Sequence, residues 1–566
     1  MTQQVGPWMT AGPALSGLSV LVLDGQASGA SPRHGTLVEL GWLVSRASDE
    51  HDAAPTTTLI ALPEGERLPR AVTRITGISR DDLAAGLAEA EAFESLLAVA
   101  RTLGTPTPTV IHYASFEMGF LRDLHARHHP EEAFAFEAVC THQIARRLMP
   151  TLPRRGLRAL AGYFGFPAEL LRRSAGHVEA TAHVWRHLVR ELEGRGVTTW
   201  PRLLDWLAQT KAPTSKRIYP MARDKRLGLP DRPGIYKMLR QNGDVLYVGK
   251  ATSLKKRVNS YFTKHKNVGE RALEMLSQAR DLAVEETATA LEAALLEADA
   301  IKALEPPYNV HLKDEVRQIW FASRDLESLE KTPDDTHPIG PLPSRLAATS
   351  LRAIARAIGG DREPLVAARS LGTGLPFAPE PEVFSEGLAR FTARWVPPLV
   401  PDPLRAVLGL SKHLWREVLA GRLVLDSDPD DEDRSWDPDR VARHLARGIV
   451  QGGQLLRRAR WLCLLCDATI AWREPTSLDE RRRLLEIASG NLRRSDYLEA
   501  GEALPGPKPR PRPAVLATFD VATYDRLRVV STELKRVMGE TGAAAVRVSS
   551  GAVLYGPRLA SLLEAV

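Results

Sequence analysis

The side chains best suited to chemistry in this chain lie within residues 233–309. Tyr236 and Tyr247 each stand close to a glycine in a short strand-like run, and Arg257 and Tyr261 follow in a basic segment. Cleavage of a phosphodiester needs an activated nucleophile, neutralisation of the charge that develops on the phosphate, and help for the leaving oxygen. A phenol can relay the proton of an attacking water, and a guanidinium can bind two phosphate oxygens at once. These residue types therefore indicate phosphodiester cleavage.

A carboxylate and a second cation complete this set. Glu297, in ALEAALLEADAIK, can hold one Mg²⁺ or Mn²⁺ ion, because Mg²⁺ accepts a few carboxylate oxygens and keeps water in its other positions. Lys250 lies three residues after Tyr247, where it can lower the pKa of a phenol or contact a phosphate. Gly234 and Gly249 leave the strand edges bare, so that backbone and substrate can approach closely. We expect a phosphodiesterase site with one metal ion.

These side chains meet only if a small set of strands and helices positions them. The sequence from 231 to 316 predicts an α/β domain of suitable length, in which strands carry the tyrosines and the last helix carries the acid. The expected elements are strands at 234–240 and 244–249, helices at 253–262 and 268–280, a strand at 281–286 and a helix at 289–304.

The order of these elements resembles the GIY-YIG nuclease domain, and most closely the version in the excision-repair nuclease UvrC and its shorter homologue Cho. GIY stands at 234–236 and YVG at 247–249, with Val248 in place of the usual Ile. The resemblance implies that Tyr247 is the general base and that Glu297 binds the metal ion. It also implies active-site roles for Tyr236, Lys250, Arg257, Tyr261 and Asn309, the Asn of PPYN.

Each of these elements is ordinary when taken alone. Tyrosines in strands are usually core or edge residues, and a Glu on a helix is usually solvated. The presence of all the elements, in order and at matching spacing, favours an active nuclease over that plain interpretation.

A second α/β domain is predicted ahead of the first, over residues 15–195. Apolar runs predict strands, and longer runs with helical spacing follow them. The domain resembles the DEDD exonucleases of the DnaQ type, which have an RNase H-like fold. The expected strands are 18–24, 37–44 and 107–112, and the expected helices are 116–129, 140–149, 155–165 and 177–195.

The catalytic positions that this second resemblance implies are mostly altered. That family binds two metal ions with four acids and uses a histidine as general base. Here Asp24 is kept, but a neutral amide, a longer acid and two basic residues stand at the other positions, namely Gln26, Glu117, Arg172 and His177. Such a set cannot hold two Mg²⁺ ions at close range. We expect a fold that has lost catalysis and serves in DNA binding or docking, with Arg172 and Arg173 on phosphate; a residual 3′–5′ exonuclease is the alternative.

The remaining sequence carries no resemblance that assigns a role to 317–566. The RNase H-type nuclease and helix-hairpin-helix motifs that UvrC carries after its first nuclease are not evident there, which matches the Cho-type arrangement with a single incision. The expected organisation is a connector at 207–230, a mainly helical region at 341–500 with an acidic break at 426–433, a Pro-rich linker at 506–513 and a small α+β unit at 514–566.

Composition bounds the class of protein. The chain has 566 residues with 75 basic and 69 acidic side chains, and basic runs at 211–226 and 250–266 flank the nuclease motifs, where they suit phosphate contacts. No apolar run reaches the roughly 18 residues that span a bilayer, and no secretory signal is evident, so no membrane contact and a cytoplasmic location are expected. Cys463 and Cys466 form a C-x-x-C that we interpret as an apolar helix face; a metal or redox role is the alternative.

Together these observations predict a fold class and a function. The fold class is α/β multidomain, with an RNase H-like exonuclease fold, a small GIY-YIG domain, a mainly helical region and a small α+β unit. The expected function is a metal-dependent DNA endonuclease of nucleotide excision repair that makes a single-strand incision near damage, by resemblance on the 3′ side. The expected partners are damaged duplex DNA and the UvrA and UvrB proteins. The alternatives are a dual nuclease and a non-catalytic DNA-binding scaffold.

Overall fold

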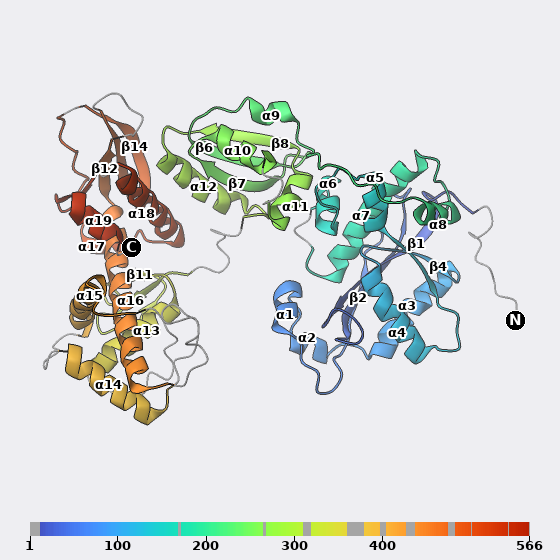
Figure 1. Cartoon of the computed structure of the whole chain (residues 1–566), viewed down its shortest axis with the longest axis horizontal. Coiled ribbons are helices and arrows are strands. Elements are labelled where there is room, and N and C mark those ends of the chain that lie inside the picture. Colours follow the sequence, from blue (N-terminus) through green and yellow to red (C-terminus); the bar gives the residue numbers. More distant parts are fainter. Residues whose placement is uncertain are drawn as a thin grey trace. The chain divides into compact units, whose positions relative to one another are not determined.

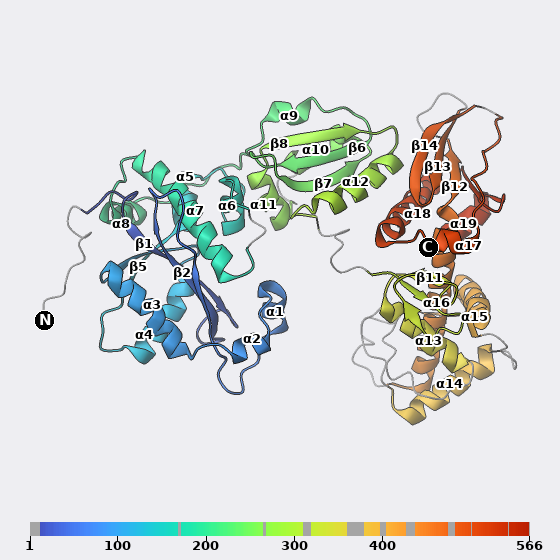
Figure 2. The same ribbon diagram turned by 180° about the vertical axis from the view of Figure 1, so that it is seen from behind.

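The structure is a computed structural model of the chain. It describes residues 12–564 apart from 168–170, 264–267, 310–317, 359–378, 397–402, 426–435, 474–480, 500 and 542. The chain divides into two compact units, the first formed by residues 1–286 with 306–309 and the second by 287–305 with 310–566. Figures 1 and 2 label many of the elements of both units. The predicted acidic break at 426–433 lies outside the described residues.

The first unit begins with a five-stranded mixed sheet. Its strand order is β3-β2-β1-β4-β5; β1, β2 and β3 are antiparallel, and β4 and β5 run parallel to β1. This is the order of an RNase H-like fold, so the predicted fold class is confirmed. The strands are β1 (Ser19–Ala27), β2 (Leu37–Arg46), β3 (Thr56–Leu59), β4 (Thr107–Ile111) and β5 (Phe136–Cys140).

Side chains of β1 point alternately to the two faces of this sheet, and a hydrophobic core lies on each face. Val20 and Val22 pack with one set of helices, and Leu21 and Leu23 with the other, because successive strand residues point to opposite faces. The first set is α5 (Thr141–Leu148), α6 (Leu157–Tyr163), α7 (Ser174–Glu193) and α8 (Trp200–Gln209). The second is α3 (Glu89–Leu103) and α4 (Ser115–His128), preceded by α1 (Arg70–Thr76) and α2 (Arg80–Ala84).

The first unit continues into a smaller antiparallel sheet with the order β7-β6-β8. Its elements lie within a few residues of the predicted positions: β6 (Gly234–Leu239), β7 (Val245–Ala251), α10 (Leu254–Thr263), α11 (Glu270–Gln278) and β8 (Asp281–Glu286). Tyr236, Met238, Leu254, Val258 and Met275 share one core, which places α10 and α11 against this sheet. The connector at 207–230 contains the end of α8 and a short helix, α9 (Arg223–Leu227).

The two sheets of the first unit are joined through α6 and α11. A Cβ on Gly162 would lie 1.8 Å from Oε1 of Gln278, so only a glycine allows the side chain of Gln278 to pack there. The backbone N–H of Arg154 donates to Oγ of Ser277 at 2.8 Å. Arg280 completes the contact by lying over the ring of a tyrosine in α6, 4.1 Å from its centroid. The small sheet is therefore attached directly to the larger domain.

The second unit contains two cores that share one long helix. α16 (Pro438–Leu465) packs in its first part with α13 (Arg345–Ile358), α14 (Pro381–Trp395), α15 (Pro403–Leu419) and a small sheet of β9 (Trp320–Ala322), β10 (Leu329–Glu330) and β11 (Ile339–Leu342). The last residues of α16, Trp461 to Leu465, enter the other core. Cys463 and Cys466 lie at this end and are not joined in a disulfide; Cys463 is half-buried and Cys466 is buried.

The second core of this unit is built on a five-stranded antiparallel sheet with the order β14-β13-β12-β15-β16. Its strands are β12 (Ala468–Trp472), β13 (Arg482–Ala488), β14 (Asn491–Leu498), β15 (Ala544–Val548) and β16 (Val553–Tyr555). The helices that pack on it are α12 (Ala290–Leu304), α17 (Arg512–Leu516), α18 (Val521–Thr541) and α19 (Gly556–Glu564).

This sheet corrects predictions made for the region 341–500 and for the tail. Residues 468–472, 482–488 and 491–498 are strands and not helices. β12 is buried at every position, so it lacks the alternation that marks a strand in sequence. The tail, predicted as an α+β unit, begins within the helix α17. The tail 514–566 is not a separate unit after a Pro-rich linker, because β15 pairs with β12 and the segment before α17 is bonded to the sheet through Arg510 and Asp467, 2.7 Å apart.

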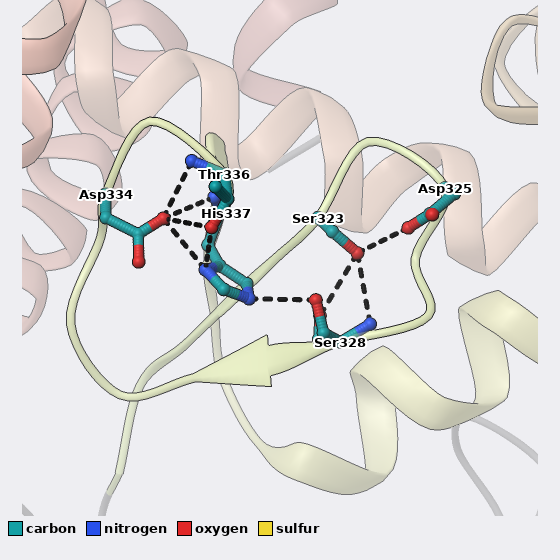
Figure 3. Close-up of polar contacts among 6 residues, drawn as sticks. All are labelled: Ser323, Asp325, Ser328, Asp334, Thr336 and His337. Atoms are coloured by element: carbon teal, nitrogen blue, oxygen red, sulfur yellow. Dashed lines mark hydrogen bonds and ion pairs between the residues drawn. The ribbon is translucent and has the colours of Figure 1, made fainter.

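A hydrogen-bonded network holds the two turns around β10 (Figure 3). His337 lies between them: its Nε2 is 2.9 Å from Oγ of Ser328, and its Nδ1 is 2.8 Å from Oδ1 of Asp334. The same Asp334 oxygen accepts the backbone N–H groups of Thr336 and His337, at 2.8 and 2.7 Å. Ser323 bonds Asp325 and Ser328 in the neighbouring turn. We assign this network to turn stability, since each partner is a loop residue of the same small sheet.

Candidate active site

The pairing of β6 with β7 places the two predicted tyrosines on one face of the small sheet. Tyr236 lies opposite Gly249, and Tyr247 is two residues before Gly249, so both rings project to the same side and their centroids are 6.0 Å apart. A Cβ on Gly249 would lie 2.5 Å from the hydroxyl oxygen of Tyr236. The glycine of YVG is therefore required for the Tyr236 ring to cross the strand.

Helix α10 adds an arginine and a third phenol to this cluster. Arg257 and Tyr261 are four residues apart and share one face of the helix. The hydroxyls of Tyr261 and Tyr236 lie 2.9 Å apart and share a hydrogen bond, and Nη2 of Arg257 is 3.5 Å from the same Tyr261 oxygen. Cζ of Arg257 lies 5.2 Å from the Tyr261 ring centroid. The structure thus brings four of the predicted residues together.

Burial separates the roles of the phenols. Tyr236 is 0% exposed, and burial, followed by the neighbouring phenols of Tyr261 and Tyr247, raises its pKa. Burial opposes ionisation of Arg257 too, but the facing phenols of Tyr236 and Tyr261 outweigh it and raise the pKa of the guanidinium. Tyr236 is therefore a neutral hydrogen-bonding phenol at physiological pH, whereas Tyr247 is only half-buried.

Lys250 lies one residue from the end of β7. It pairs with Ile235, and strand alternation therefore places it on the opposite face of the sheet from the tyrosines. Its predicted role near a phenol or a phosphate stays a prediction.

Asn309 is engaged with the backbone of β7. Its Oδ1 accepts the N–H of Val248 at 2.9 Å, and its Nδ2 donates to the carbonyl oxygen of Val248 at 2.8 Å. The preceding residue, Tyr308, donates its backbone N–H to the carbonyl of Leu246 at 3.1 Å. Because β7 is an edge strand, these bonds satisfy backbone groups that would otherwise be unpaired. We infer that Asn309 positions Tyr247 through the backbone, rather than touching a substrate.

Glu297 lies on α12, which belongs to the second unit, and is half-buried there. The chain leaves the first unit after Glu286 and returns to it at Pro306. α12 is held in the second unit by ion pairs on both sides of Glu297: Glu292 with Arg483 at 2.9 Å, and Lys302 with Asp525 at 3.1 Å. A single carboxylate fits an ion that keeps mostly water ligands.

The altered exonuclease positions form a cluster of their own on β1, α4 and α7. Nε2 of Gln26 donates to Oδ2 of Asp24 at 2.9 Å, and Nδ1 of His177 lies 3.2 Å from Oδ1 of Asp24. Burial lowers the pKa of His177, but the Asp24 carboxylate outweighs it, and the net shift is upward. Glu117 is buried, and burial, followed by repulsion from Asp24, raises its pKa to about 9. A hydrogen-bonded Asp24–His177 pair and a buried acid with a raised pKa stand where metal-binding carboxylates were expected.

Two arginines precede α7, and only one is exposed. Arg172 is exposed, as a phosphate contact requires. Nε of Arg173 instead donates to Oε1 of the buried Glu39 at 2.8 Å, and the backbone N–H of Ser174 donates to the other oxygen at 2.9 Å. The bond to Glu39 disfavours the predicted phosphate contact of Arg173, which stays a prediction, and Glu39 is a residue that sequence patterns did not reveal. Across the described ranges, no three His, Cys, Asp or Glu side chains are grouped to hold a metal ion.

The fold and the site define a GIY-YIG domain attached to an RNase H-like fold. Comparison with known proteins agrees: residues 232–310 match the family of the UvrC-like GIY-YIG domain. The chain is 43% identical over 123 residues to the UvrABC system protein C of Legionella pneumophila (strain Lens), a match that covers 20% of each protein. Residues 232–310 are therefore a UvrC-like GIY-YIG domain.

A longer match includes residues outside this domain. The chain is 30% identical over 331 residues to the "Putative bifunctional exonuclease/endonuclease protein MT2247" of Mycobacterium tuberculosis (strain CDC 1551 / Oshkosh), covering 57% of this chain and 49% of that protein. The chain thus spans about half the length of this relative and a fifth of the Legionella protein.

A solved structure matches the domain alone. It is the GIY-YIG N-terminal endonuclease domain of UvrC from Thermotoga maritima bound to magnesium, 34% identical, with a TM-score of 0.15; the match covers 16% of this chain and 94% of that one. No helix among the described residues is both long and apolar enough to cross a membrane.

Proposed function

We propose that the chain is a DNA endonuclease of nucleotide excision repair that makes one single-strand incision near damage. The observation that carries the proposal is the cluster in which Arg257 and Tyr261 of α10 face Tyr236, next to Tyr247 on the same sheet face. By similarity to UvrC, the cut lies on the 3′ side of the lesion, and UvrA and UvrB deliver the damaged duplex.

In this mechanism each side chain has a separate task. Tyr247, which is half-buried whereas Tyr236 is buried, relays the proton of the attacking water: its oxygen accepts that proton as its own hydroxyl proton passes to solvent. Arg257 binds non-bridging oxygens of the scissile phosphate, and Tyr261 orients the guanidinium. Tyr236 stays protonated and fixes Tyr261 through the shared hydrogen bond. Glu297 is the residue that would hold one Mg²⁺ or Mn²⁺ ion, which supplies Lewis-acid charge neutralisation when bound.

A nicking assay on ultraviolet-irradiated supercoiled plasmid, with and without damage-recognition partners, tests the proposal. Arg257→Ala and Glu297→Gln should abolish nicking while DNA binding persists. Arg232→Ala is the matched control, since Arg232 is a 74% exposed arginine of the same domain. Nicking by either site variant at near the wild-type rate would show that the cluster is not the catalytic centre.

Two other functions remain to be tested against this one. A dual nuclease would need the exonuclease-like domain to hold metal, and the Asp24–His177 pair with Gln26 beside it disfavours that. End-labelled single-stranded DNA incubated with the Glu297→Gln chain and Mg²⁺ or Mn²⁺ should stay intact; stepwise shortening would support the dual nuclease. A scaffold without catalysis would bind damaged plasmid and leave it uncut.

A further inference from the structure

A basic groove lies on the side of α10 that faces away from the tyrosine cluster. Its volume is about 940 Å³, and its walls are the connector residues around α9 and one face of α10. Lys255 and Asn259 line it, and they are offset by two residues from Arg257 and Tyr261, ~200° around the helix. The groove is therefore distinct from the cluster assigned to cleavage.

The charge of the groove is strongly positive. Arg217, Arg223, Lys255 and Lys256 line it and are exposed. Among the described residues of its lining, Asp231 is the one acid; it lies 3.6 Å from Nζ of Lys256, and that pair is weak because both side chains are more than half exposed. The net charge suits a polyanion such as a sugar–phosphate backbone.

One further arginine builds the wall of the groove. Nη1 of Arg226 donates to Oδ1 of Asn259 at 2.6 Å, and its Cζ lies 4.4 Å from the ring centroid of Phe262. These contacts fix α9 to α10 and give the groove a definite shape. Apolar side chains also reach its rim, since Ile218 and Leu227 are 63% and 49% exposed.

The groove leads toward the exonuclease-like domain within the same unit. The backbone N–H of Ile218 donates to the carbonyl of Thr151 at 2.9 Å, which holds the connector against the loop before α6. Arg155 in that loop donates Nη1 to the carbonyls of Met149 and Leu152, at 3.1 and 2.6 Å. Its pKa is lowered by burial first and then by arginines around it, Arg217 of the groove included. Positive charge therefore continues from the groove to this loop.

An exposed tyrosine stands where this charge ends. Tyr113 is 48% exposed, and its ring centroid lies 4.3 Å from that of His142. A Cβ on Gly156 would lie 3.9 Å from the Tyr113 hydroxyl oxygen, so the ring borders the loop that contains Arg155. Tyr113 has φ of 63°, a left-handed conformation that is costly for a tyrosine and is kept only when the surrounding fold imposes it.

We propose that these residues form one binding surface for single-stranded DNA, in which Arg217, Arg223, Lys255 and Lys256 hold the backbone and Tyr113 stacks on an unpaired base. The choice of DNA as the ligand rests on the proposed function. A single strand is favoured over a duplex because an exposed ring can stack on an unpaired base, whereas both faces of a base inside a continuous duplex are covered by its neighbours. The surface would hold a strand displaced near the incision. Tyr113, at one end of this surface, belongs to the exonuclease-like domain.

Fluorescence anisotropy of a labelled single-stranded oligonucleotide with the full chain in EDTA tests this surface. Arg223→Glu with Lys255→Glu should weaken binding ~10-fold or more. The slope of log affinity against log salt concentration should also become shallower, by about the amount that two phosphate contacts contribute. Arg493→Glu, a change of an exposed arginine on β14, is the control and should bind like the wild type. Equal affinities of the groove variant and the control would overturn the proposal.

The stacking part is tested by two changes at one position. Tyr113→Ala should weaken binding about 10-fold, whereas Tyr113→Phe should bind like the wild type, since stacking needs the ring and not the hydroxyl. Loss of affinity in both, or in neither, would remove Tyr113 from the surface. Because no divalent ion is present, this assay measures binding without cleavage. Failure here is therefore separate from failure of the nuclease, which the nicking assay with Arg257→Ala tests.

Discussion

Nη2 of Arg483 on β13 lies 2.9 Å from Oε1 of Glu292 on α12, and both side chains are buried. The other oxygen of Glu292 accepts the backbone N–H of Thr289 at 3.0 Å and closes a capping box at the start of the helix. One carboxylate therefore begins α12 and attaches it to the sheet of the second unit. Glu297, the proposed metal ligand, lies five residues further along the same helix.

Arg483→Met should destabilise the second unit by about 3–5 kcal/mol, because it removes the only cation paired with the buried Glu292 carboxylate among the described residues and leaves it the hydroxyl of Ser495 and the backbone N–H of Thr289. Urea unfolding gives the free energy of unfolding. Arg494→Met is the control, since that arginine is 57% exposed, and its change should stay below about 0.5 kcal/mol. Glu292→Met combined with Arg483→Met should recover most of the stability that Arg483→Met loses. If the double variant is as unstable as the single one, lost packing and not the unpaired charge is responsible.

Tyr247→Phe and Tyr236→Phe should differ in their effect on nicking. Loss of the Tyr247 hydroxyl removes the proposed base and should slow nicking by about 10²–10⁴-fold. Loss of the Tyr236 hydroxyl removes one hydrogen bond to Tyr261, at 2.9 Å, and should slow nicking by roughly 10-fold. Single-turnover rates on damaged plasmid compare the two. The reverse order would assign the base to Tyr236.

Gly249→Ala should destabilise the small sheet by about 1–3 kcal/mol, because the added methyl meets the Tyr236 hydroxyl oxygen at 2.5 Å and Cε1 of Tyr247 at 2.7 Å. Both tyrosines would have to move, so the nicking rate of the variant should decrease as well as its stability. Gly269→Ala is the control, since a Cβ there meets nothing within 4 Å. Thermal unfolding and nicking are measured for both variants, and equal behaviour would refute the steric role.

Glu117→Gln should change how stability depends on pH. The pKa of Glu117 is raised from 4.5 to about 9, so between these values the folded state binds a proton that the unfolded state has lost. Stability therefore falls as pH rises across this window, by up to roughly 1.4 kcal/mol per pH unit from this group. Urea unfolding at pH 5, 7 and 8.5 measures the free energy of unfolding. The value for the variant should rise relative to that for the wild type as pH rises. Glu131→Gln, at an exposed acid, should show no such trend.

Sequence patterns predicted the small nuclease sheet well because its signals are local. The strands β6 and β7, the helix α10 and the strand β8 lie at the predicted positions, and each has its own periodicity or turn. The same reasoning failed at β12, where burial at every position hides the strand period, and for the tail, whose strand β15 pairs with a strand more than seventy residues away in sequence. Pairing between such distant segments leaves no local trace.

The sequence by itself determined the residue types of the site and the altered exonuclease positions, because these are identities at a given spacing. Only the tertiary structure decided which phenol is buried, that Arg173 is bound to Glu39, and that Asn309 bonds to the backbone of Val248. It also decided that Arg217 and Tyr113, about a hundred residues apart in sequence, border the same loop. The physical reason is that three properties of a residue depend on which distant segment packs beside it. These are its exposure to solvent, its ion-pair partner and, on an edge strand, the partners of its backbone hydrogen bonds.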